Sequence, residues 1–239
     1  MLLRLPTSVS GARECLAEGA VPIGGATLLW AEWQRDGFPT LAMSLRGVPE
    51  ANALGRGTLG AAVVLHRIDG RVPDVLRLAA ASVGTGAVRR TATVGGNLVG
   101  STLRCLLPAA LVLEARASVL GPDGVRETDL SEVTAKRPLL LGLRWREPVA
   151  SAYRKLPAEP GGRPPLTVSV ALHADTPGPR RLRVAVRDGY EVIDGSAPYD
   201  DPDTALHTLR ATALRDLPED AWDAVDAQVA AVLRAAGDG

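Results

Sequence analysis

Two glycine pairs constrain this chain more than any other feature of its sequence. They are Gly24-Gly25 and Gly95-Gly96, and each pair follows an apolar residue. Because glycine lacks a Cβ atom, it adopts positive φ readily and lets an anion approach bare main-chain N–H groups. Glycine pairs also mark ordinary turns, and a chain with 25 glycines contains some pairs by chance. Two such loops that face each other, however, can hold a diphosphate between them.

The residues around the two pairs form longer motifs that resemble a known family. The second pair lies in Val88-Arg89-Arg90-Thr91-Ala92-Thr93-Val94-Gly95-Gly96-Asn97-Leu98. This motif, with Pro108-Ala109-Ala110-Leu111 after it, resembles the second FAD-binding loop of the flavoprotein subunits of the xanthine dehydrogenase and carbon monoxide dehydrogenase family. The first pair, in the segment 21–29, is similar to that family's first loop. Ala152-Tyr153-Arg154-Lys155 and the segment 166–171 are similar to the start of its C-terminal domain.

The resemblance implies an α+β fold with two parts. The first is a two-subdomain FAD-binding fold of the vanillyl-alcohol-oxidase/para-cresol-methylhydroxylase type, and the second is a small C-terminal domain of antiparallel sheet and helices. We expect the FAD-binding domain at 1–147, with subdomains at about 1–53 and 54–147, and a shortened C-terminal domain at 148–239. The boundary is drawn where Arg146-Glu147-Pro148 follows an apolar segment.

The resemblance also implies a non-covalent FAD site. Main-chain N–H groups of the first loop would line one side of the diphosphate, and the second loop would line the other, with the Asn97 side-chain amide. Leu140 or Leu141 would pack near the isoalloxazine, and Lys155 would place a positive charge there that stabilises the anionic reduced form. The implied contacts are Pro22, Ile23, Gly24, Gly25, Ala26, Thr27, Leu28, Gly84, Val88, Ala92, Thr93, Gly95, Gly96, Asn97, Leu140 and Lys155.

The chain departs from the family pattern at three places. Leu106 stands where the family usually has an aspartate, Thr102-Leu103 replaces a Ser-Pro pair, and Thr27 replaces an acidic residue. Four interpretations therefore stay open. The chain is an electron-transfer subunit that needs a molybdopterin large subunit and an iron–sulfur small subunit. Otherwise it is a stand-alone FAD-dependent dehydrogenase or oxidase of a small organic or carrier-bound substrate, a degenerate binding protein, or an unrelated α/β domain.

Composition agrees with a soluble enzyme domain but does not select one. The chain is 46% hydrophobic and 23% charged with zero formal net charge, so neither a nucleic acid nor a membrane is expected as a partner. It lacks a signal-peptide pattern and an apolar run of about 18 residues, which favours the cytoplasm. Cys15 and Cys105 cannot ligate an iron–sulfur cluster, which needs four ligands, and they lack zinc spacing, so no metal is expected.

The apolar pattern predicts alternating helices and strands. Helices are expected at 8–20, 27–33, 73–83, 108–115 and 218–236. Strands are expected at 20–23, 40–45, 60–68, 117–120, 125–128, 166–173 and 182–187, with a hairpin turn at 121–124. The last helix would place Trp222, Val225, Val229 and Leu233 on one face.

The remaining motifs do not indicate a catalytic or cofactor-binding site. Gly55-Arg56-Gly57-Thr58-Leu59-Gly60 matches G-x-G-x-x-G, but it precedes a strand-like segment instead of opening a helix, so NAD binding is not assigned there. Asp200-Asp201-Pro202-Asp203 suits either a cation or a solvated helix-capping turn, and the capping turn is expected. His66, His173 and His207 are scattered, with His66 expected to be structural, and no catalytic residue is assigned. A flavin would itself carry the redox chemistry.

Overall fold

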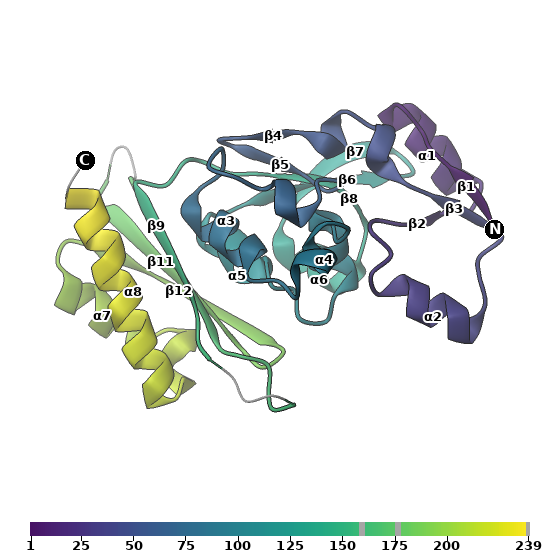
Figure 1. The fold of residues 1–239 in the computed structure, drawn as a ribbon. Helices are drawn as coiled ribbons and strands as arrows, with labels where there is room; N and C mark the ends of the chain where they lie inside the picture. The colour runs from purple at the N-terminus through teal and green to yellow at the C-terminus, as the bar shows by residue number, and fades with distance from the viewer. Residues whose placement is uncertain (158–160, 175–177, 238–239) are drawn as a thin grey trace. The chain divides into compact units, whose positions relative to one another are not determined.

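The computed structural model describes residues 1–157, 161–174 and 178–237, and the chain forms two compact units (Figure 1). Unit 1 consists of Met1–Val72, Val83–Cys105 and Ala115–Trp145, and unit 2 consists of Pro73–Ser82, Leu106–Glu114 and Arg146–Gly239. The expected domain limits at 1–147 and 148–239 stay a prediction.

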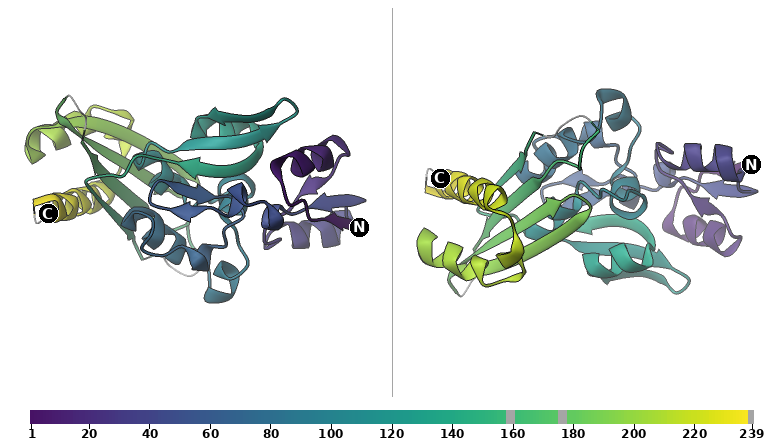
Figure 2. Two further views of the ribbon diagram at one scale, coloured as in Figure 1. Left: turned by 90° about the horizontal axis from the view of Figure 1, so that it is seen from above. Right: turned by 90° about the horizontal axis from the view of Figure 1, so that it is seen from below.

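Unit 1 begins with a three-stranded parallel sheet in the order β1-β3-β2, formed by Leu2–Arg4, Leu41–Met43 and Val21–Pro22. Helices α1 (Val9–Ala17) and α2 (Leu29–Asp36) lie on opposite sides of these strands (Figures 1 and 2). The Ser8 hydroxyl caps α1 by accepting the Gly11 N–H, as the predicted N-terminus required. Helix α1 buries Ala12 and Cys15, whereas α2 has no buried residue. The predicted helices and strands of this region are confirmed within a few residues.

The second sheet of unit 1 has five antiparallel strands in the order β4-β5-β8-β6-β7. They are Leu54–Gly55, Thr58–Gly60, Leu139–Arg144, Arg116–Gly121 and Gly124–Thr128. The predicted hairpin at 121–124 joins β6 to β7. The G-x-G-x-x-G glycines form the β4–β5 hairpin, and no helix follows them directly. The structure therefore confirms that this motif is not a dinucleotide fingerprint.

The expected strand at 60–68 is wrong. Strand β5 ends at Gly60, and Leu65–Arg67 is a 3-10 helix in which His66 is exposed. The segment between them instead pairs irregularly with the second glycine loop. The Val94 N–H donates to Val63 O at 3.0 Å, and the Gly95 N–H donates to Ala61 O at 2.8 Å. An apolar, β-branched run was predicted as a strand, but its backbone partner is a loop.

Short helical elements complete unit 1. They are η1 (Leu45–Gly47), η2 (Glu50–Asn52), η3 (Leu65–Arg67), α4 (Gly86–Arg89), the π-helix η4 (Gly96–Gly100) and α6 (Leu130–Lys136). Element η4 begins inside the second glycine pair. The second glycine loop therefore leads directly into helical backbone.

Unit 2 contains a four-stranded antiparallel sheet in the order β12-β11-β10-β9. The strands are Glu191–Tyr199, Arg180–Asp188, Thr167–His173 and Ala150–Lys155. One face packs against α7 (Pro202–Arg210) and α8 (Glu219–Gly237) in a core that includes Val170, Val184 and Trp222. Asp201 caps α7 by accepting the Thr204 N–H, which confirms the predicted helix-capping turn. Between α7 and α8 lies the 3-10 helix η5 (Ala213–Asp216).

The opposite face of this sheet is polar and lies against two further helices of unit 2. These are α3 (Asp74–Ala81) and α5 (Leu107–Val112), which confirm the helices expected at 73–83 and 108–115. The Val75 N–H donates to the Ser151 hydroxyl at 3.3 Å, and the buried His173 ring contacts Val112 O through Nε2 at 2.7 Å. Since side chains alternate along a strand, Val168 and Val170 face α7 and α8, whereas Thr167, Ser169 and His173 lie on the opposite face.

Candidate functional site

The two glycine loops are in contact within unit 1. A Cβ atom added at Gly24 would collide with Oγ1 of Thr93, and one added at Gly25 would collide with the main-chain carbonyl oxygen of Thr91. Only glycine therefore lets the first loop approach the second so closely. The same Thr93 hydroxyl accepts the Gly96 N–H at 3.1 Å.

The first loop presents free hydrogen-bond donors. In the described part of the chain, the main-chain N–H groups of residues 24–27 have no hydrogen-bond partner. Within this segment Ala26 adopts a left-handed conformation with φ 52°, and helix α2 begins at Leu29 without a side-chain cap. Successive free N–H groups beside a helix N-terminus form a concavity that favours an anion.

The second loop has already used its main-chain donors. The N–H of Gly95 is bound to Ala61 O, that of Gly96 to the Thr93 hydroxyl, and that of Asn97 to Thr93 O at 2.9 Å. Thr93 and Asn97 are each only 6% exposed. The second loop therefore forms a rigid wall against which the free donors of the first loop are held.

A third loop of unit 1 is held by an arginine that sequence reasoning did not assign to the site. Gly84 has a left-handed φ of 46°, and a Cβ atom there would lie 3.2 Å from Cγ1 of Val88. Nη1 of Arg89 donates to the carbonyls of Val83 and Gly84 at 2.9 and 3.0 Å. Arg89 belongs to the motif around the second glycine pair, so its position in that motif could have identified it as a site residue from the sequence.

The other expected contacts of unit 1 differ in exposure. Pro22 and Leu28 are exposed, and Ile23 is half-buried. In contrast, Ala92 is 8% exposed and Leu140 is 2% exposed. Leu140 lies within strand β8, so its side chain offers little surface to any ligand.

Lys155 belongs to unit 2, where a short hydrogen-bond chain holds it. Its Nζ donates to Ser82 O at 3.0 Å. The Ser82 hydroxyl donates to Ala79 O at 2.8 Å and lies 2.8 Å from the Tyr153 hydroxyl. Because Ser82 has one hydroxyl proton, we assign Tyr153 as the donor of the second bond.

The Lys155 ammonium has a carbonyl partner but no acidic partner among the described residues. Among the described residues, no carboxylate lies within ion-pair distance of it. The other lysine, Lys136, pairs with Glu132 at 3.2 Å. Within the described residues, the positive charge of Lys155 is therefore not paired with a negative one.

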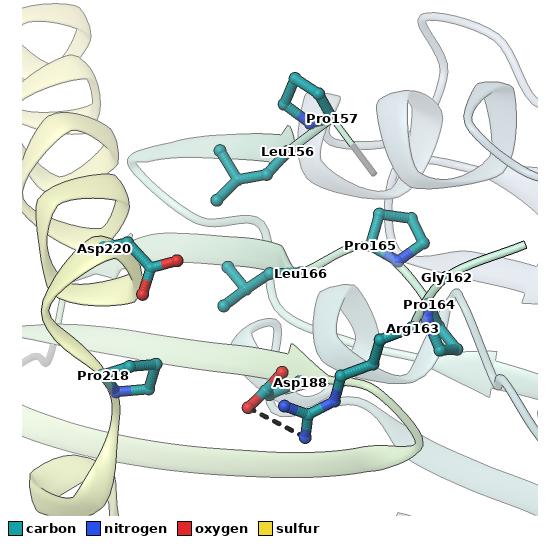
Figure 3. Close-up of a pocket in the computed structure, with 10 residues that line it drawn as sticks. All are labelled: Leu156, Pro157, Gly162, Arg163, Pro164, Pro165, Leu166, Asp188, Pro218 and Asp220. Carbon is teal, nitrogen blue, oxygen red and sulfur yellow. Dashed lines mark ion pairs between the residues drawn. The ribbon is translucent and has the colours of Figure 1, made fainter. Parts of the chain in front are cut away.

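A pocket of about 480 Å³ lies at one end of the sheet of unit 2 (Figure 3). Arg163 and Asp188 on its wall form an ion pair at 3.3 Å, which neutralises part of the polar lining. None of the expected cofactor contacts lines it. Its walls consist of Leu156, Pro157, Gly162, Arg163, Pro164, Pro165, Leu166, Asp188, Pro218 and Asp220.

In the part of the chain that the structure describes, no helix combines the length and the apolar character needed to cross a lipid bilayer. The cytoplasmic location stays a prediction.

The fold is shared with chains of solved oxidoreductase structures. Quinoline 2-oxidoreductase from Pseudomonas putida 86 superposes with a TM-score of 0.71 at 19% identity, covering 99% of this chain and 96% of that chain. Reconstituted CO dehydrogenase from Oligotropha carboxidovorans gives 0.71 at 20% identity, covering 98% and 96%. Carbon monoxide dehydrogenase from Hydrogenophaga pseudoflava, in a form that lacks the Mo-pyranopterin moiety, gives 0.68 at 18% identity, covering 99% and 96%. These similarities confirm the expected α+β fold.

The sequence itself identifies the family. No curated protein shows significant similarity to the chain. The family described as FAD binding domain in molybdopterin dehydrogenase, however, matches residues 3–140, which include both glycine loops. This match excludes an unrelated α/β domain and confirms FAD as the cofactor. The chain belongs to the FAD-binding domain family of the molybdopterin dehydrogenases and is an FAD-dependent oxidoreductase of that family.

Proposed function

We propose that this chain is the FAD-carrying subunit of a molybdenum hydroxylase and passes electrons from iron–sulfur clusters to an external acceptor. Its proposed partners are a molybdopterin large subunit and an iron–sulfur small subunit. Two cysteines cannot supply the four ligands of a cluster, so the clusters would belong to another chain. The similarity to the carbon monoxide dehydrogenases, one of which is described by its molybdenum cofactor, extends over nearly the whole chain and supports a subunit of the same kind.

The observation that carries the proposal is the set of free donors at residues 24–27, held against Thr93. Oriented N–H groups beside a helix N-terminus suit a diphosphate, because they bind its oxygens without adding a side-chain charge. We assign the FAD diphosphate to this concavity, with the main-chain N–H groups of the first loop as donors. Gly96 would allow close approach from the second loop.

The remaining expected contacts have supporting roles in this proposal. Gly84, Val88 and Ala92 would meet the adenine or flavin portion, and Leu140 would support the isoalloxazine from within its strand. The isoalloxazine supplies the redox chemistry when FAD is bound. Lys155, whose ammonium has no acidic partner among the described residues, would place a positive charge near the isoalloxazine, where it favours a negatively charged ring system.

The proposal is tested on the purified chain with added FAD. We expect one FAD per chain that dithionite reduces, and no reduction by small organic substrates unless the large and small subunits are present. Reduction of the isolated chain by such a substrate would instead support the stand-alone dehydrogenase or oxidase. A folded protein that takes up no FAD would refute both and favour a degenerate binding protein.

A further inference from the structure

Four buried polar atoms gather at one place on the polar face of the sheet of unit 2. They are Nε and Nη1 of Arg187, Oγ1 of Thr167 and Oγ of Ser169, and among the described residues none of them has a hydrogen-bond partner. Arg187 and Thr167 are register partners on β11 and β10, and Ser169 follows Thr167 by two residues. Register partners lie about 5 Å apart and successive residues on one face about 7 Å apart, so the three side chains form one cluster.

Arg187 brings a positive charge into this cluster. It is 2% exposed, and only its Nη2 atom is bound, through a hydrogen bond to Pro165 O at 2.9 Å. A guanidinium keeps its proton in proteins, so burial cannot neutralise it as burial can neutralise a lysine or a carboxylate. A buried charge without an opposite charge costs stability. The free donor atoms of Arg187 therefore require an explanation.

The nearby acids of unit 2 are paired with other groups. Arg183, on the same face of β11, pairs with Glu114 at 3.0 Å and with Asp194 at 2.8 Å. Asp188 follows Arg187 directly, but it lies on the opposite face and has an ion pair of its own. Among the described residues, Arg187 has no ion pair. The fold thus supplies two carboxylates to one arginine of β11 and none to the other.

We infer that Arg187, Thr167 and Ser169 bind one small inorganic anion of about the size of chloride. The guanidinium provides the opposite charge and free N–H donors, and each hydroxyl can rotate to donate its proton to the same anion. Because all four atoms are buried, a monatomic anion suits the cluster better than a larger oxyanion or an organic acid. The site lies within unit 2 and does not depend on bound FAD.

The anion would stabilise the end of the sheet that carries this cluster. It would connect β10 to β11, while Nη2 of Arg187 holds the main chain of Pro165 just before β10. A ligand that binds only the folded protein shifts the folding equilibrium toward it. The thermal stability of the chain should therefore depend on chloride itself and not only on ionic strength.

The first test measures melting temperatures of the FAD-free chain in sodium chloride and in sodium gluconate at equal ionic strength. Gluconate is too large for a buried cluster, so it controls for screening. Chloride at ten times its dissociation constant should favour the folded state about tenfold, which raises the melting temperature by about 3–6 °C for a chain of this size. Equal melting temperatures in the two salts would overturn the inference.

Variants locate the effect. Arg187→Met should lose the difference between chloride and gluconate, and Thr167→Val, which removes one hydroxyl, should reduce it. Arg180→Met is the matched control, because Arg180 is an exposed arginine at the start of the same strand, and it should keep the full difference. A folded Arg187→Met protein that keeps the full difference would also overturn the inference.

A direct observation decides the matter even if Arg187→Met does not fold. Crystals of the wild-type chain grown in sodium bromide should show an anomalous peak, at a wavelength near the bromine absorption edge, within hydrogen-bond distance of Arg187 and Thr167. Density without an anomalous signal at this place would mean a water molecule and would refute the anion site. A bromide peak without any chloride-dependent stabilisation would mean an adventitious ion only, which also refutes it. None of these results depends on the proposed function, because no FAD is present.

Discussion

Oγ1 of Thr93 occupies the space next to Gly24 in which a Cβ atom would have to lie. This contact makes the two glycine loops one structural unit, although about seventy residues separate them in the sequence. Thr93 also binds the N–H of Gly96, so it fixes the second loop while it supports the first. The free donors of the first loop are thus pre-organised before any cofactor binds.

Replacement of Gly25 by alanine should release FAD. A Cβ atom there would meet the Thr91 carbonyl, so the first loop must move away from the second and its N–H groups lose their orientation. Flavin content per chain after gel filtration measures the loss. Gly70→Ala is the control, because nothing lies within 4 Å of a Cβ atom at Gly70. Equal flavin retention in both variants would contradict the assigned diphosphate position.

Gly96→Val should separate folding from cofactor binding. A Cβ atom at Gly96 lies 3.1 Å from Thr93 Oγ1, which is tight but requires only a shift of a few tenths of an ångström. We therefore expect a folded protein with a slightly lower melting temperature that does not retain flavin, because the side chain extends toward the diphosphate. Full flavin content in a folded Gly96→Val protein would place the cofactor elsewhere.

Lys155→Met should lower the flavin reduction potential with little change in thermal stability. Methionine keeps most of the apolar stem but removes the positive charge. That charge stabilises the anionic reduced flavin, so its loss lowers the potential. Lys136→Met serves as the control, since Lys136 is exposed and paired with Glu132. A redox titration of both variants, each fully loaded with FAD, decides the matter. An unchanged potential in Lys155→Met would make this lysine an ordinary surface residue.

The cluster around Glu132 should give unit 1 a pH-dependent contribution to stability. Hydrogen bonds from Arg126, Thr128 and Lys136 lower the pKa of Glu132 from 4.5 to about 2. Because the pKa is lower in the folded protein, the carboxylate stabilises the fold above about pH 4.5, and this contribution disappears as the pH falls toward 2.

Melting temperatures of Glu132→Gln and wild type measured from pH 7 to pH 2 test this expectation. The variant should melt lower at pH 7, and the difference should shrink below pH 4.5. Glu127→Gln provides a neighbouring exposed carboxylate as the control. A difference between Glu132→Gln and wild type that is constant over the whole range would rule out the pKa shift as its cause.

Local signals predicted most of the secondary structure. The Ser8 cap, the turn at 121–124 and the apolar stripe of α8 each depend on residues close in sequence, so a single chain reveals them. The prediction of a strand at 60–68 was wrong because the backbone of this segment pairs with the second glycine loop. Hydrophobic periodicity cannot identify such a partner. Strand β12 was missed because it contains Gly195 and Pro198, which are uncommon within strands.

The candidate site was predictable only in part. The glycine pairs are visible as motifs, and the family match includes both. Which N–H groups stay free depends on partners such as the Thr93 hydroxyl and Ala61 O, so it required the structure. Arg187 alternates with the core valines of β11, so the sequence pattern predicts that this residue is exposed. Its burial on the polar face depends on tertiary packing that the sequence pattern does not contain.

The central claim is that the two loops hold one non-covalent FAD. The most direct measurement is the visible absorption spectrum of the purified chain after incubation with FAD and removal of excess, followed by acid precipitation and chromatography of the released flavin. The account predicts a flavin spectrum with one FAD per chain, all of it recovered in the supernatant. A folded, colourless protein would contradict the account, and so would flavin that stays with the precipitated chain.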